Sequence, residues 1–402
     1  MNLEEISPVC DLRVERSMAR HFAGLEDPRR STQSRHKLIE MIVIAIAATL
    51  GGADGWTGVE TFAKAKEAWR RTFLELPEGL PSHDTFGRVF ALIDPAQFAA
   101  CFRHWSAAVV ERIPDEIIAV DGKTLRRSHH RRQGLAALHL VSAWATANRV
   151  VLGQVATDAK SNEITAIPRL LAWLKREGCI VTIDAMGGQT KIAAQIIDPG
   201  GDDVLALKGN QETLAAEVEE AFIDADAKGY VGVESAFLET VERGHGRRET
   251  RRYRTLGDLS GVPRSVLCKG MNRIGLVESR REVAGKVSTE PRYFIGRLGT
   301  SAARFAHAVR GHWGIENGLH WNLDLSFRED ECRVRDPVAR ENLAVLRHLA
   351  LSRLKNDDTK LGIQNKRLRA AWNEDYLTKL LFESPKSKGK TDASATANIS
   401  HA

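Results

Sequence analysis

The chain has 402 residues, of which 43% are hydrophobic and 12 are prolines. This composition excludes a mainly disordered protein, and the length favours two or three structural units over one compact core. The 58 Lys and Arg against 52 Asp and Glu give a net charge of +6, which is compatible with a polyanionic partner without requiring one. Five cysteines, an odd number without a C-x-x-C pair, argue against a disulfide framework or a zinc ribbon.

The first 112 residues are expected to form helices, because their apolar residues recur at helical spacing. The apolar run over 39–50 contains Glu40 and is shorter than the roughly 20 residues that cross a bilayer, so it predicts a buried core helix. Ser82 or Asp84 is expected to cap the helix that contains Phe86. The N-terminus lacks a basic segment followed by an apolar one, so we expect no signal peptide, no membrane partner and a cytoplasmic location.

Beyond residue 113 the pattern is that of an α/β domain. We expect strands over 117–121, 138–144, 150–155, 180–184 and 204–207. Helices are expected at about 163–176 and from about 189, between the later strands. Three strands followed by helix, strand, helix and strand is the element order of the RNase H-like fold, although other α/β domains share parts of it.

The sequence predicts three regions. A helical N-terminal domain over 1–112 is expected to bind DNA ends. A catalytic domain over 113–350 contains a β-rich insertion at about 226–300, which precedes a long helix that begins near Ser301 and carries Glu316. Residues 351–402 are expected to form a C-terminal helix and a disordered tail, because the last residues are rich in Lys, Ser, Thr and Ala.

Three carboxylates stand where they could carry chemistry. Asp121 and Asp184 each end an apolar strand, so they are expected at the C-terminal edge of a sheet, where α/β active sites form. A single Asp in such a place is more often a helix cap, but two in one domain weaken that reading. The helix face of Glu316 is otherwise apolar and aromatic with two imidazoles, so we expect a buried carboxylate that needs a cation.

Three ionised carboxylates held together predict a metal site. At 4 to 5 Å each pair would repel by roughly 4 kcal/mol at an effective dielectric constant near 20. One or two Mg²⁺ ions would compensate this repulsion, and Mn²⁺ could replace them. Two such ions can activate a water or a 3′-hydroxyl for the in-line displacement of a phosphodiester.

Three ordered blocks, at 118–126, 182–189 and 312–321, resemble the signature blocks of insertion-sequence transposases related to the H-repeat-associated proteins. Members of that family are DDE enzymes with an RNase H-like core. The resemblance covers roughly 15–350 and implies that Asp121, Asp184 and Glu316 are the catalytic, metal-binding triad. It also implies double-stranded DNA partners, namely the terminal inverted repeats and the target, and a homodimer or larger synaptic complex.

The chain departs from the family around the glutamate. Many related transposases have a Tyr-x-x-Arg-x-x-x-Glu-x-x-x-x-x-x-Lys pattern, but here Val309, His312 and Leu323 stand at the Tyr, Arg and Lys positions. Arg127 stands where a glycine is expected. The cations that contact phosphate are therefore expected elsewhere.

Basic residues cluster in two further stretches. A charge run is often only a solvated face, but six arginines beside two acids favour phosphate contact. The expected DNA contacts are Lys123, Arg126, Arg127, Lys208, Arg243, Arg247, Arg248, Arg251, Arg252, Arg310 and His312. Trp313 and Trp321, which flank the glutamate, are expected in the core rather than as platforms for base stacking.

These observations favour a DDE transposase that hydrolyses phosphodiesters in a metal-dependent reaction and transfers 3′-hydroxyl strands. Two alternatives remain open. An RNase H-like nuclease that only hydrolyses would carry the same acids. A transposase-derived DNA-binding protein whose catalysis has decayed would account for the altered cation pattern. A metal-free hydrolase with a carboxylate pair explains neither the third acid nor the arginines.

Overall fold

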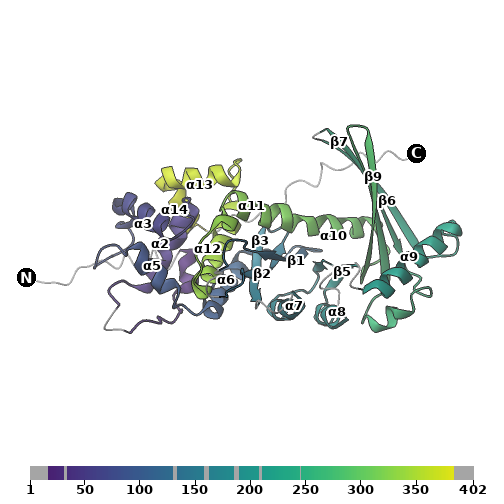
Figure 1. Ribbon diagram of the computed structural model, residues 1–402, viewed down its shortest axis with the longest axis horizontal. Helices are drawn as coiled ribbons and strands as arrows, with labels where there is room; N and C mark the ends of the chain where they lie inside the picture. Colours follow the sequence, from purple (N-terminus) through teal and green to yellow (C-terminus); the bar gives the residue numbers. More distant parts are fainter. Residues whose placement is uncertain are drawn as a thin grey trace, which may run out of the picture.

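Figure 1 shows an elongated molecule with a helical bundle at one end, a sheet in the middle and long strands at the other end. This computed structural model describes residues 17–30, 34–129, 134–157, 163–184, 190–207, 211–244 and 246–383. Lys208, one of the predicted DNA contacts, lies outside the described residues. Among the helices of the described ranges, none combines the length and the apolar character needed to cross a lipid bilayer.

The helical bundle combines two segments that are far apart in the sequence. The first contributes η1 (Met18–Phe22), α2 (Leu38–Leu50), α3 (Trp56–Ala65), α4 (Glu67–Arg70), α5 (His83–Phe90) and α6 (Pro95–Val109). The second contributes α12 (Pro337–Lys355), α13 (Ile363–Trp372) and α14 (Glu374–Phe382). Both segments share one hydrophobic core. The boundary predicted at residue 350 falls within α12.

Helix α2 lies at the centre of this bundle. Every residue of the helix except Ile39 is buried, which confirms the predicted core helix. Helices α3, α12, α13 and α14 pack around it. The buried carboxylate of Glu40 accepts hydrogen bonds from the backbone N–H groups of Glu75 and Leu76, at 2.8 and 3.2 Å. These bonds compensate the burial of a charged group inside the bundle. The predicted cap of α5 by Ser82 is also present.

Five strands form the central part of the sheet. They are β1 (Ile117–Thr124), β2 (His139–Ala145), β3 (Val150–Thr157), β4 (Ile180–Ile183) and β5 (Asp202–Ala206). Strand β2 pairs antiparallel with both β1 and β3, whereas β4 pairs parallel with both β1 and β5. Helices α7 (Glu163–Leu171) and α8 (Thr190–Ile197) cover one face, and α10 (Ala302–Ile315) crosses the other (Figure 1).

The β-rich stretch continues the same sheet. Its strands are β6 (Ser235–Gly244), β7 (Arg247–Leu256), β8 (Arg273–Val283) and β9 (Lys286–Gly296), and they follow α9 (Glu212–Ala227). Strand β9 pairs antiparallel with β5, which gives the order β3-β2-β1-β4-β5-β9-β8-β7-β6. The predicted β-rich segment before the glutamate helix is therefore present. It ends in a four-stranded projection, which we call the β-arm (β6–β9).

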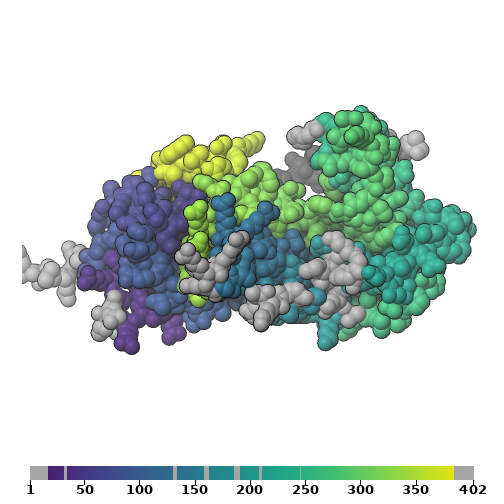
Figure 2. All heavy atoms as spheres, viewed as in Figure 1, coloured from purple at the N-terminus to yellow at the C-terminus, as the bar shows by residue number. Residues whose placement is uncertain are grey.

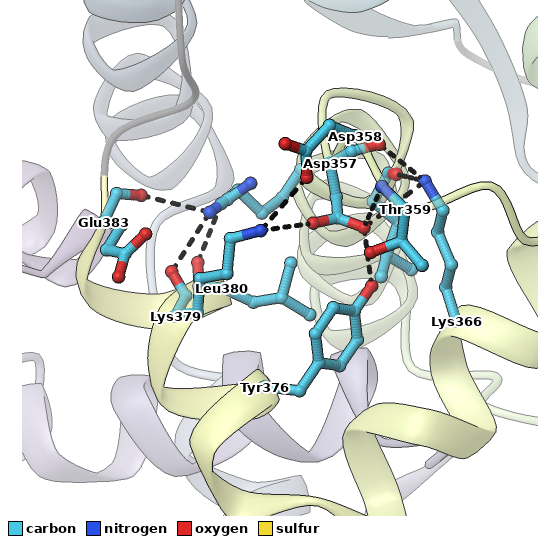
Figure 3. A network of polar contacts seen from close by, with 10 residues as sticks. Asp357, Asp358, Thr359, Lys366, Tyr376, Lys379, Leu380 and Glu383 are labelled. Carbon is cyan, nitrogen blue, oxygen red and sulfur yellow. Dashed lines mark hydrogen bonds and ion pairs between the residues drawn. The ribbon is translucent and has the colours of Figure 1, made fainter.

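A buried carboxylate joins the last three helices (Figure 3). The Asp357 side chain is fully buried, and its oxygens lie 3.1 Å from Lys379 Nζ and 3.5 Å from Lys366 Nζ. The Tyr376 hydroxyl donates a hydrogen bond to it at 2.9 Å. Burial opposes ionisation of Asp357, but hydrogen bonds from Thr359, Tyr376 and Lys379 outweigh burial and lower its pKa. The network fixes α13 and α14 to the end of α12.

We expect Asp357→Asn to lower the free energy of unfolding by about 3 kcal/mol at pH 7, because it leaves the buried Lys366 ammonium without a counter-charge. Because the pKa of Asp357 is lower in the folded protein than the ordinary Asp pKa of 3.8, its carboxylate stabilises the folded state fully at pH values above 3.8. This stabilisation is lost as the pH falls toward the pKa of the folded state. The difference in free energy of unfolding between the wild type and Asp357→Asn should stay constant from about pH 7 to 5 and become smaller by roughly 1 kcal/mol at pH 3.

Urea unfolding at these pH values measures the effect. The matched control is Asp358→Asn, whose side chain is 64% exposed and pairs with Lys379. An exposed pair contributes little, so the control should change stability by less than about 1 kcal/mol. Equal losses in the two variants would contradict the role of the buried network.

Candidate active site

Asp121 and Asp184 lie next to each other on parallel strands. Strands β1 and β4 pair from Ile117↔Ile180 to Val120↔Ile183, so the next residue on each strand is one of the two acids. Neighbouring strands are about 4.8 Å apart, which brings the two residues to the same edge. Strand β1 continues to Thr124 by pairing with β2. The prediction that Asp121 ends its strand is therefore wrong. Asp121 lies inside β1, at the point where the parallel pairing with β4 stops.

Asp121 and Asp184 share the face of the sheet on which α10 lies. Side chains alternate along a strand, so Asp121 lies on the same side as Ile117, and Asp184 on the same side as Ile180. Ile117 and Ile180 pack with Phe305 of α10 in one apolar cluster. The sheet therefore presents Asp121 to the glutamate helix. Asp184 directly follows β4 and, in the described part of the chain, is not among the residues whose ligand atoms cluster with those of Glu316.

Helix α10 carries Glu316 to this edge. The helix begins after Ser301, as predicted, and the Ser301 hydroxyl caps it by accepting a hydrogen bond from the Arg304 N–H. It continues as a π-helical turn, η7 (Glu316–His320), and then as α11 (Trp321–Leu325). The expectation that Glu316 is buried is wrong, since the structure exposes it. Ile315 and Leu319 occupy the buried positions of the helix and leave Glu316 at the rim.

Glycines allow the helix to approach the sheet closely. A Cβ atom at Gly311 would lie 2.7 Å from Ile117 Cγ1, and one at Gly314 would lie 2.9 Å from Thr146 Cγ2. At Gly318 it would lie 3.0 Å from an indole atom on β2. Any larger residue at these positions would push the helix away from the sheet. The three glycines thus set the height of Glu316 above the strand acids.

Asp121, Glu316 and His320 form a cluster that could hold a metal ion. One ligand atom from each residue lies within 4.8 Å of the other two. His320 Nε2 is 3.3 Å from Asp121 Oδ2, and the Gly122 N–H donates to Asp121 Oδ1 at 2.9 Å. Burial opposes ionisation of Asp121, but His320 and Gly122 outweigh burial and hold its pKa below the usual value. Sequence reasoning missed His320 as a site residue, although its spacing of four from Glu316 is a usable signal.

His312 lies among the three acids. Its Nδ1 is 3.0 Å from the Thr182 hydroxyl on β4, and the ring is half-buried. Burial lowers the pKa of His312, although the negative charges of Asp121, Asp184 and Glu316 act in the opposite direction. The imidazole is therefore neutral near pH 7. This placement favours a role in positioning the helix on β4 over the predicted contact with phosphate.

Lys123 belongs to a buried ion cluster behind the acids. Its Nζ lies 2.7 Å from Asp324 Oδ1 and 3.0 Å from Glu329 Oε2. Glu329 is 1% exposed, and its other oxygen lies 3.6 Å from Arg347 Nη1 on α12. Burial opposes the charge of Lys123, but Glu329 and Asp324 outweigh burial and raise its pKa. Lys123 therefore compensates internal acids and ties β1 to the helices, which does not favour the predicted contact with DNA.

Some of the predicted DNA contacts on the β-arm and on α10 form ion pairs within the protein. Arg251 and Arg310 both pair with Glu242, at 3.1 and 2.6 Å. Arg252 pairs with Glu239 at 2.8 Å. The pair between Arg310 and Glu242 connects α10 to β6. For these three arginines the placement favours support of the β-arm over free phosphate contact.

Other predicted DNA contacts are exposed. Arg243, Arg247 and Arg248 lie at the turn between β6 and β7, at the tip of the β-arm. Arg126 and Arg127 follow β1 and are exposed as well, although Arg126 lies 3.3 Å from an oxygen of Asp330. These side chains remain accessible to a polyanion.

The two tryptophans beside the glutamate are exposed. Trp313 is 47% exposed and Trp321 is 58% exposed, so the expectation that they belong to the core is wrong. The Arg292 guanidinium lies over the Trp313 ring at 5.0 Å from its centroid. Of the residues between the tryptophans, Ile315, Leu319 and His320 take the buried positions, because α10 and η7 rest on the sheet through their glycine face. An aromatic surface therefore flanks Glu316.

Strand acids and a helix acid at one sheet edge define an α/β protein with a carboxylate-centred site. The chain belongs to the DDE transposase family. Residues 112–353 match the family described as Transposase DDE domain, and residues 19–106 match the family described as DDE_Tnp_1-associated. The predicted resemblance to insertion-sequence DDE transposases is confirmed by these matches, and the relatives below confirm the similarity to H-repeat-associated proteins.

Two relatives from Escherichia coli match nearly the whole chain. The H repeat-associated putative transposase YhhI of strain K12 is 36% identical over 376 residues, which cover 91% of this chain and 98% of that protein. The putative transposase YncI of O157:H7 is 37% identical over 386 residues, which cover 94% and 97%. A cryo-EM structure of the piggyBac transposase synaptic complex with hairpin DNA is similar at a TM-score of 0.42 and 9% identity, over 94% of this chain and 80% of that chain.

We expect Gly311→Ala to lower the free energy of unfolding by about 1–3 kcal/mol, because the added methyl group overpacks the contact with Ile117. The loss should occur although alanine is the better helix former. Urea unfolding measures it. The control is Gly299→Ala, where an added Cβ meets no atom of the described residues within 4 Å. A Gly311→Ala variant as stable as wild type would contradict the close approach.

Proposed function

We propose that this protein is an active DDE transposase that hydrolyses phosphodiesters at the ends of an insertion sequence and joins the freed 3′-hydroxyls to target DNA. The observation that carries the proposal is the cluster of Asp121, Glu316 and His320, whose ligand atoms lie within 4.8 Å of one another. Asp184 follows the neighbouring strand at the same level. Together with family membership, this cluster favours an active site over a decayed one.

A divalent cation fits these residues. Within the described part of the chain, neither nitrogen of the buried His320 ring has a hydrogen-bond partner, and such burial costs free energy unless a partner arrives. Two carboxylates this close also repel each other without a counter-charge. When bound, the cation would activate a water or a 3′-hydroxyl and stabilise the leaving oxygen. Mg²⁺ is the expected ion, with Mn²⁺ as a substitute.

The residues of the chain would hold and orient the reacting groups. The Gly122 N–H fixes one oxygen of Asp121, which leaves the other toward the cluster. The ion pairs of Lys123 with Glu329 and Asp324 hold β1 against the helices. Glu316 is exposed, so DNA would approach from its side of the sheet edge.

The catalytic core is proposed to be RNase H-like. Strands β1 to β5 have the order 3-2-1-4-5 with β2 antiparallel to its neighbours, which supports this assignment. The first acid is on β1, the second follows β4, and the third is on the helix that comes after the β-arm. Residues 1–112 would be the DNA-end-binding domain.

The DNA is proposed to lie along α10. Figures 1 and 2 show the helical bundle and the β-arm at opposite ends of the molecule, with α10 between them. Arg243, Arg247 and Arg248 at the tip of the β-arm and Arg126 and Arg127 beside β1 would contact phosphates. The helical bundle would recognise the terminal inverted repeats. Holding two ends together implies a homodimer or a larger synaptic complex.

We expect wild-type protein with Mg²⁺ to cleave labelled DNA carrying the ends of the parent element and to join the 3′-ends to a target. Asp184→Asn and Glu316→Gln should lower both reactions by roughly 10²–10³-fold or more, because each removes a carboxylate charge that is proposed to hold the cation. EDTA should abolish both reactions. DNA binding, measured separately by gel shift, should be retained. The control is Glu331→Gln, a half-exposed surface acid paired with Arg328.

Other results would favour the other functions. Binding by the wild type without cleavage would favour a decayed DNA-binding protein. Cleavage without joining would favour an RNase H-like nuclease that only hydrolyses. Cleavage unaffected by Asp184→Asn and Glu316→Gln would contradict the proposed site.

The exposed tryptophans are proposed to stack on DNA bases near the cleaved bond. Stacking contributes roughly 1–3 kcal/mol per base, so Trp321→Ala should lower cleavage about 5–150-fold, whereas Trp321→Phe should retain most of it. Fluorescence of 2-aminopurine at the element end measures stacking directly. The control is Trp372→Ala on α13, where the side chain is 75% exposed and remote in the bundle. An equal effect of Trp372→Ala would contradict a specific platform.

A further inference from the structure

We propose, resting on the proposed function, that His320 Nε2 is a ligand of the divalent cation held by Asp121 and Glu316 and makes the site favour Mn²⁺ over Mg²⁺. The motif that identifies this family consists of carboxylates alone. In this chain an imidazole completes the cluster. The nitrogen ligand distinguishes this site from one made only of oxygen ligands.

The His320 ring is buried and makes no aligned hydrogen bond, although its Nε2 approaches Asp121 Oδ2 to 3.3 Å. His320 is only 6% exposed. Neither Nδ1 nor Nε2 makes a hydrogen bond with any residue in the described ranges. Buried polar atoms almost always have partners, and the exceptions call for an explanation such as an ion. A cation between His320 and the acids would satisfy one of the two nitrogens.

The His320 ring is directed toward Asp121. Nε2 lies 3.3 Å from Asp121 Oδ2, but the two atoms are not aligned as a hydrogen bond. Asp121 Oδ1 is engaged by the Gly122 N–H at 2.9 Å. The ring therefore points at the one oxygen of Asp121 that faces the cluster, and Glu316 lies on the third side.

The local helix geometry also places His320 beside Glu316. Glu316 and His320 are the first and last residues of η7, the π-helical turn in which the Trp321 N–H donates to the Glu316 carbonyl. Such single turns insert one extra residue into a helix and occur frequently at functional sites. Here the turn exposes Glu316 at the rim and still directs the buried His320 toward Asp121.

A nitrogen ligand changes which ion binds best. Mg²⁺ takes oxygen ligands and keeps several waters, so an imidazole adds little to its binding. First-row transition ions accept imidazole nitrogen more readily. The site should therefore bind Mn²⁺ more tightly than Mg²⁺, and the difference should depend on His320.

The test uses Mn²⁺ bound to the full-length protein without DNA. Pulsed electron paramagnetic resonance detects ¹⁴N bonded directly to Mn²⁺, and we expect this signal in the wild type. It should change when the protein is labelled with ¹⁵N-histidine, which requires no substitution. It should disappear in His320→Gln, with Mn²⁺ affinity reduced at least roughly tenfold, since even outer-shell partners of a metal contribute that much. Mg²⁺ affinity, measured by competition, should change less than Mn²⁺ affinity.

Two matched variants locate the nitrogen. His307→Gln, at an exposed position of the same helix, should leave the nitrogen signal unchanged. His312→Gln should also retain it, since the Nδ1 of His312 contacts Thr182. Loss of the signal in His312→Gln with retention in His320→Gln would overturn the assignment.

The test separates this inference from the proposed function. Mn²⁺ that binds in the wild type, is lost in Asp121→Asn and carries no directly bonded nitrogen would overturn the role of His320 and leave the proposed carboxylate site intact. No binding of Mn²⁺ by the wild type, or binding indifferent to Asp121→Asn, would overturn both. The ¹⁵N-histidine measurement gives the answer even if His320→Gln does not fold.

Discussion

Glu316 meets the strand acids only because α10 lies directly on the sheet. Gly311 faces β1, Gly314 faces the turn between β2 and β3, and Gly318 faces β2. A Cβ atom at any of these positions would come within about 3 Å of its neighbours. The capped start of the helix and the pairing of β9 with β5 bring the helix to this place. A helix held one methyl group higher would separate the carboxylate of Glu316 from Asp121. The site at this sheet edge therefore depends on the close approach of α10 to the sheet.

The same approach concentrates negative charge, and the structure compensates it from the nearest cations. Lys123 and Arg347 surround the buried Glu329, and Arg251 and Arg310 meet Glu242 where the β-arm touches α10. Buried acids require such partners because charges are costly to desolvate. Some of the cations predicted to contact phosphate form ion pairs inside the protein instead, whereas those at the tip of the β-arm remain accessible.

The rim of the site has a different character. Trp313 and Trp321 are exposed on either side of Glu316, and the Arg292 guanidinium covers one of the rings. An aromatic surface beside a carboxylate cluster suits a partner with both phosphates and bases. The π-helical turn between them separates the exposed glutamate from the buried imidazole of His320. One short segment of the helix thereby carries both the aromatic rim and the proposed metal ligands.

The sequence by itself determined the strands that carry Asp121 and precede Asp184, the buried helix α2, the cap at Ser82, the start of the long helix near Ser301, and the family. These features follow from periodicity and spacing, which neighbouring residues decide among themselves. Only the tertiary structure decided the exposure of Glu316, the partners of Lys123, the place of His320 and the shared core of α2 and α12. Each of these four features depends on contacts between residues that lie up to hundreds of positions apart in the sequence. Close packing and charge compensation decide which of these distant residues come into contact.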